Sequence, residues 1–66
     1  MKHESYLDGW LAHKNGVPIE ANPHDEKVAE ASNFRWTNGW CSRFQCIKHG
    51  GDIESEDADI TNEYFP

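Results

Sequence analysis

The amino-acid sequence predicts a small all-α protein: an antiparallel two-helix hairpin in residues 1–51, followed by an acidic disordered tail in residues 52–66. Two stretches repeat apolar residues with the period of a helix, and a connector containing Pro18 and Pro23 separates them. The net charge of −6 lies entirely in the tail, which is typical of a segment that stays unfolded. With 66 residues, the chain has room for a single domain.

The first helix is expected over about residues 3–15. Its apolar stripe consists of Tyr6, Leu7, Trp10 and Leu11. Asn15-Gly16 favours a helix end, with Gly16 in the left-handed conformation. Gly9 lies inside the helix at a cost of about 1 kcal/mol relative to Ala. That cost indicates a place where another backbone comes close.

The second helix is expected over about residues 24–48. Asn22 suits the N-cap position and Pro23 the first helical position. An i+4 ladder then runs through Val28, Ser32, Trp36, Trp40 and Phe44. His49-Gly50-Gly51 predicts the end of the helix, and a break near Ser32-Asn33 is an alternative.

A β-hairpin is the competing interpretation of residues 34–44. Asn38-Gly39 is a strong two-residue hairpin turn, and aromatic residues flank it. A hairpin would, however, place Trp36 and Trp40 on opposite faces, and an isolated hairpin is marginally stable in water. A helix places them on one face, so the helix is favoured.

Both expected helices carry a glycine directly before a tryptophan, as Gly9-Trp10 and Gly39-Trp40. Glycines at a helix contact let two backbones approach closely, and the indoles can fill the space beside them. The sequence therefore predicts that the two helices pack through these glycines, although a chance repetition is the alternative.

Charge divides the chain into two parts. Residues 1–51 carry six acids and six bases, which cancel, whereas residues 52–66 carry six acids and no base. The acids of this tail are Asp52, Glu54, Glu56, Asp57, Asp59 and Glu63. An acidic chain is poorly suited to nonspecific DNA binding, which depends on Lys and Arg. An alternative to a disordered tail is that Tyr64 and Phe65 pack back onto the helices.

The sequence has no feature of secretion or of a membrane span. Its first residues lack the apolar region of a signal peptide, and no apolar run approaches about 20 residues. We therefore expect a cytoplasmic protein whose Cys41 and Cys46 are reduced. The two thiols would lie about 140° apart on a helix, which is unsuited to a structural zinc site. We expect no metal and no cofactor.

Several glycine, proline and tryptophan residues follow one another in a distinctive order within residues 5–48. They are Gly9-Trp10-Leu11-Ala12, Gly16, Asn22-Pro23 and Trp36-Thr37-Asn38-Gly39-Trp40. This order resembles the ribosome modulation factor family, whose signature Trp-x-x-Gly-Trp the last segment fits in full. The resemblance implies a two-helix protein that binds the bacterial ribosome near the small-subunit RNA and promotes inactive ribosome dimers. Phage- and plasmid-borne relatives exist, and some have been described as modifying fluoroquinolone drugs.

The candidate residues for contact with RNA or another partner are four cations: Arg35, Arg43, Lys48 and Lys14. Arginine beside aromatic side chains suits contacts with the RNA backbone and stacking on bases. Together with the resemblance, they predict binding to the ribosome or its RNA and regulation of translation. The alternative is that these cations are ordinary solvated charges.

A second function stays open because family members are strongly basic, whereas this chain is neutral over the matching region. It would be a phage-type modulator or nucleic-acid mimic whose acidic tail occupies a basic surface of a host protein. We expect no enzyme activity, drug modification included. There is no phosphate-binding loop, and nothing orients His13 or His49 as a base. A homodimer would complete the core if two helices do not suffice.

Overall fold

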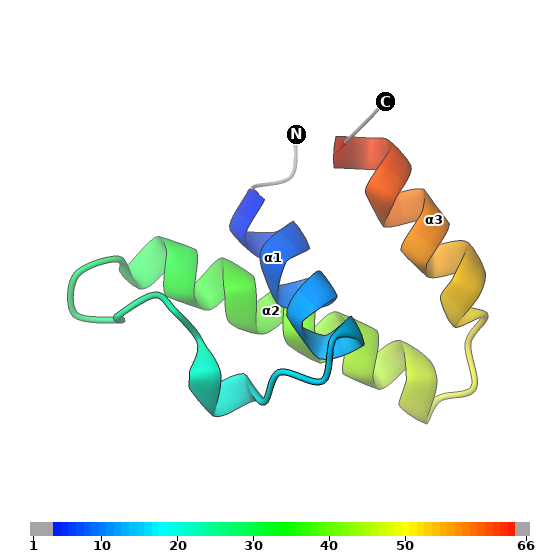
Figure 1. The fold of residues 1–66 in the computed structure, drawn as a ribbon, viewed down its shortest axis with the longest axis horizontal. Coiled ribbons are helices and arrows are strands. Elements are labelled where there is room, and N and C mark those ends of the chain that lie inside the picture. Colours follow the sequence, from blue (N-terminus) through cyan, green and yellow to red (C-terminus); the bar gives the residue numbers. More distant parts are fainter. Residues whose placement is uncertain (1–3, 65–66) are drawn as a thin grey trace.

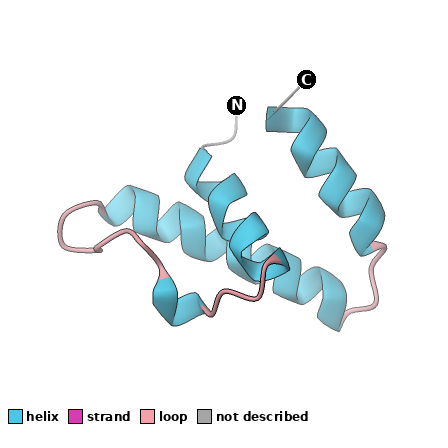
Figure 2. Ribbon diagram, viewed as in Figure 1, coloured by secondary structure: helices cyan, strands magenta, loops and turns pink. Residues whose placement is uncertain are grey.

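The computed structural model describes residues 4–64, which fold into helices joined by loops (Figure 1, Figure 2). The elements are α1 Glu4–Lys14, the short 3₁₀ helix η1 Ile19–Ala21, α2 Glu30–Lys48 and α3 Ile53–Tyr64. The predicted all-α class is confirmed. No helix in this range is both long enough and apolar enough to cross a membrane.

Helix α1 lies across α2, and the two backbones touch at two buried glycines (Figure 1). A Cβ atom on Gly9 would collide with the carbonyl oxygen of Trp36 and lie 2.7 Å from its carbonyl carbon. A Cβ on Gly39 would collide with the carbonyl oxygen of Tyr6 and lie 3.0 Å from the Trp10 nitrogen. The predicted close approach of the two helices at their glycines is confirmed.

Helices α1 and α2 end in the same glycine motif. The N–H of Val17 donates to the Ala12 carbonyl, and Gly16 has a φ of 79°. At the end of α2, Gly51 donates to Cys46 in the same way, and Gly50 has a φ of 73°. Because only glycine adopts this left-handed conformation without strain, these residues stop the helices as predicted.

The second helix starts later than expected, at Glu30 rather than near residue 24. Asn22 does not cap it: its Oδ1 accepts a hydrogen bond from the His24 N–H, and its Nδ2 donates to Thr37 Oγ1. Asp25 Oδ1 likewise accepts from the Lys27 N–H. Such local side-chain bonds compete with helix formation, so residues 22–29 form a loop.

From Glu30 onward α2 is continuous through Ser32-Asn33 and through residues 34–44. The hairpin interpretation of residues 34–44 is therefore wrong. Of the predicted ladder, Trp36 is buried, whereas Phe44 is exposed, and Val28 lies in the loop before the helix. The aromatic ladder thus packs fully only where α1 crosses it.

The expected disordered tail is wrong over residues 53–64, which form α3. Asp52 Oδ1 accepts a hydrogen bond from the Ser55 N–H and so caps the new helix. Ile60 is 5% exposed and joins Leu7 and Trp10 in the core, with Ile53 packed at its edge. The helix orders because these isoleucines cover apolar surface that α1 leaves open. Phe65 lies outside the described residues, as does residue 3 of the expected first helix.

Candidate anion-binding site

Three hydrogen bonds converge on the carboxylate of Asp57, in α3. Arg43 donates to it twice, from Nε to Oδ1 and from Nη2 to Oδ2, each over 3.0 Å. Trp10 donates its indole N–H to Oδ1 over 2.6 Å. Two-pronged pairing of a guanidinium with a carboxylate is among the stronger polar contacts in proteins. We call Trp10, His13, Lys14 and Arg43 the anion cradle.

The cradle is built by the crossing of α1 and α2. Trp10 and His13 are three residues apart on α1 and so lie on the same face. Arg43 comes from α2, one turn after Gly39, where the helices are closest. Because the glycine contacts hold α1 against α2, the indole N–H and the guanidinium can meet one carboxylate.

An aromatic group adjoins the cradle. The His13 ring lies nearly perpendicular to two other rings, with its centroid 4.8 Å from that of Trp40 and 6.0 Å from that of Phe44. Trp40 and Phe44 stack on each other at 5.7 Å. Trp40 also donates its indole N–H to the Val17 carbonyl over 2.7 Å, which holds the connector against α2. Stacked rings beside a guanidinium are a suitable surface for nucleic-acid bases.

The cradle favours the ionised form of its carboxylate. The hydrogen bond from Arg43 is the largest influence that lowers the pKa of Asp57 below its ordinary value. Burial acts in the opposite direction, while the Trp10 hydrogen bond and the charge of Lys14 lower the pKa further. The cradle therefore stabilises a negative charge at the position of the Asp57 carboxylate.

His13 is held neutral in this arrangement. Its Nδ1 lies 3.0 Å from Nη1 of Arg43. Because arginine can only donate, Nδ1 accepts, and the ring proton sits on Nε2. Burial first, and then the positive charge of Arg43, lower the pKa of His13, while Asp57 raises it. If His13 were protonated, its Nδ1–H would point at the Nη1–H of Arg43, and the two positive charges would repel each other.

We expect the free energy of unfolding to decrease as the pH falls through 6.5, the ordinary pKa of histidine. The pKa of His13 is lowered in the folded chain, so the unfolded chain takes up this proton first and becomes favoured. The free energy of unfolding decreases again as the pH falls below 3.8, because the pKa of Asp57 is also lowered in the folded chain. Urea unfolding between about pH 7.5 and pH 5 measures the first effect. His13→Gln should flatten the pH dependence, and the exposed control His49→Gln should not. Equal slopes in wild type and His13→Gln would contradict the assignment.

The structure brings two of the four predicted contact residues together. Arg43 is 9% exposed and binds Asp57, and the charge of Lys14 acts on the same carboxylate. Arg35 is exposed two turns before Arg43, and Lys48 is exposed at the end of α2. The four cations thus do not form one continuous face.

Sequence reasoning missed Asp57 as a site residue, along with the contributions of Trp10 and His13. Asp57 looked like one of six interchangeable tail acids. A signal was nevertheless present, because Ile53, Asp57 and Ile60 follow the i, i+4, i+7 spacing of a helical face. An acid on such a stripe is a candidate partner for a buried base.

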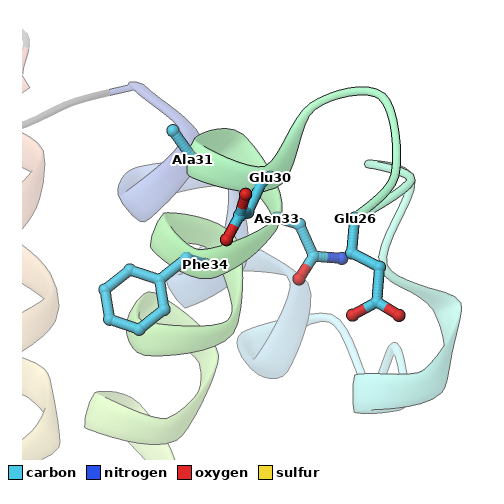
Figure 3. A pocket seen from close by; sticks show the side chains of 5 residues that line it. All are labelled: Glu26, Glu30, Ala31, Asn33 and Phe34. Atoms are coloured by element: carbon cyan, nitrogen blue, oxygen red, sulfur yellow. The ribbon is translucent and has the colours of Figure 1, made fainter.

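A separate hollow of about 430 Å³ lies where α2 begins (Figure 3). It is lined by Glu26, Glu30, Ala31, Asn33 and Phe34. Figure 3 shows the Phe34 ring directed away from the side on which Glu26 lies. The Asn33 amide already donates to the His24 carbonyl over 2.7 Å. The remaining polar groups are two carboxylates on an exposed rim, which define no particular ligand.

Within residues 4–64, no three His, Cys, Asp or Glu side chains gather closely enough to hold a metal ion. Comparisons of the chain with models of protein families, with curated proteins and with solved structures give no match.

Proposed function

We propose that this chain is a non-enzymatic regulator of translation that binds ribosomal RNA, with the cradle receiving a backbone phosphate. The observation that carries the proposal is the convergence of Arg43 and Trp10 on a single carboxylate, beside the charge of Lys14. A guanidinium fork fits two phosphate oxygens as it fits two carboxylate oxygens. The resemblance to ribosome modulation factors supports the choice of ribosomal RNA as the source of that phosphate.

The surroundings of the cradle also suit RNA. Trp40 and Phe44 form a stacked pair next to His13, and Phe44 is 42% exposed. An exposed aromatic ring beside a phosphate site can receive a base from a single-stranded segment, and stacking of this kind contributes about 1–3 kcal/mol per base. The ligand would thus be a phosphate with an unpaired base beside it.

Cosedimentation of the full chain with purified bacterial ribosomes tests this function. We expect binding that weakens as salt is raised, because phosphate contacts release counterions. Lys14→Gln should weaken binding, since Lys14 contributes charge at the cradle. The control Lys27→Gln removes the same charge from the exposed loop before α2 and should have little effect. Absence of ribosome binding by both the full chain and its Asp57→Asn variant would exclude the function.

A second function is favoured by a different observation, the exposed acids of α3. Glu54, Glu56 and Asp59 are exposed, and residues 52–66 contain no base. We propose as the alternative that these acids bind a basic surface of a host protein. Replacing all three acids with their amides should then abolish capture of that protein, and the same replacement should not weaken binding to ribosomes. Capture of the same partner by the triple variant would contradict this alternative.

A further inference from the structure

We propose that α3 blocks the cradle from within the chain, with Asp57 occupying the position of the phosphate. This inference rests on the proposed binding of RNA and adds its regulation. While α3 is docked, the Asp57 carboxylate uses Nε and Nη2 of Arg43 together with the indole N–H of Trp10. The third guanidinium nitrogen, Nη1, faces His13. An external phosphate can reach these donors only after Asp57 leaves.

The attachment of α3 is of limited extent. Among residues 53–63, Ile60 is the one buried side chain, and Ile53 and Asp57 are partly buried. The other side chains of that range are exposed. A loop containing Gly50 and Gly51 precedes the helix, and Gly50 has a φ of 73°. Glycines in a short loop allow a helix to change its direction at low cost. The helix can therefore leave while α1 and α2 keep their glycine contacts.

Charge makes docking of α3 and binding of RNA mutually exclusive. The helix carries acids and no base, so it would repel a nucleic-acid backbone lying beside it. A hollow of about 600 Å³ separates part of α3 from α1, with Lys14 on one wall and Glu54 and Asp57 on the other. A phosphate entering this hollow meets Lys14 first and then competes with Asp57 for Arg43. Binding of RNA is thus coupled to release of α3.

Asp57→Asn tests the blocking role in the full chain, with purified bacterial ribosomes as the probe. The amide cannot accept two charge-assisted hydrogen bonds, so the open state becomes more populated. The apparent Kd is the intrinsic value divided by the open fraction, and we expect it to decrease about tenfold. Asp59→Asn is the matched control, because Asp59 is exposed on the same helix and the charge change is identical. This control should change the Kd by less than about twofold.

Hydrogen–deuterium exchange of wild-type residues 53–63 gives a second, independent readout. Exchange in this range should become faster when ribosomes are added, because α3 leaves the core. Slower exchange would overturn the inference, since α3 would then lie in the interface. This measurement also decides the question if Asp57→Asn fails to fold by circular dichroism.

The outcomes separate the two proposals. Ribosome binding with equal Kd for wild type, Asp57→Asn and Asp59→Asn would overturn the blocking role and leave the proposed function standing. No binding by any of the three proteins would overturn both. Tighter binding by Asp57→Asn alone, with faster exchange in α3, supports both.

Discussion

Gly39→Ala is expected to destabilise the fold by about 3 kcal/mol or more, although alanine is the better helix former. The added Cβ would collide with the Tyr6 carbonyl oxygen and lie 3.0 Å from the Trp10 nitrogen. These are backbone atoms, which cannot rotate away as a side chain can. Helices α1 and α2 must therefore separate, and the core around Trp10 and Trp36 opens. Gly9→Ala should act in the same way through the Trp36 carbonyl.

Urea unfolding followed by circular dichroism measures this loss. Since a domain of this size has a total stability of about 3–5 kcal/mol, we expect Gly39→Ala to be largely unfolded. Asn38→Ala is the matched control, because Asn38 is exposed and adjacent in the same helix. It should leave the stability unchanged or raise it slightly. A Gly39→Ala protein as stable as Asn38→Ala would show that the helices do not meet at these glycines.

Arg43→Gln is expected to cost about 3 kcal/mol of stability, because it leaves a partly buried carboxylate without its cation. Of its two donors, the Asp57 carboxylate keeps Trp10 and loses Arg43, and His13 Nδ1 loses its donor. If α3 detaches in this variant, water hydrates the Asp57 carboxylate, and the loss of stability is smaller. Because the guanidinium is also the centre of the cradle, ribosome binding should decrease along with stability.

Arg35→Gln is the control for this variant. Arg35 lies on the same helix and loses the same charge, but it is exposed, so the expected change in stability is within about 0.5 kcal/mol. The two variants should be compared by urea unfolding and by ribosome cosedimentation. Equal stability of the two would contradict the role of the Arg43–Asp57 pair. Equal ribosome binding would contradict the cradle as the phosphate site.

Much of the α1–α2 unit could be predicted from local patterns. The tryptophan spacing favoured a helix over a hairpin in residues 34–44, and α2 runs through this range. Gly16 and Gly50 end their helices in the left-handed conformation as expected. The start of α2 could not be placed, because Asn22 suits an N-cap and a local turn equally well. Its bonds to Thr37 and to the His24 N–H decide for the turn.

The site was predicted only in part. Arg43 and Lys14 were two of the four candidate cations, and both act on the Asp57 carboxylate. Nothing local distinguished Arg43 from Arg35, because each follows or precedes an aromatic residue on the same helix. Burial of Arg43 depends on α1 crossing above it and on α3 closing beside it. Those are contacts between segments far apart in the chain.

By itself, the sequence determined the helical class, the helix-ending glycines and the close contact of α1 with α2. These features follow from glycine's missing Cβ and from the 3.6-residue period, which are properties of the residues alone. The tertiary structure alone decided that residues 53–64 fold and that Asp57 lies on Arg43. An acidic segment remains unfolded unless another surface supplies apolar contacts and a cation. Here Leu7, Trp10 and Arg43 supply both.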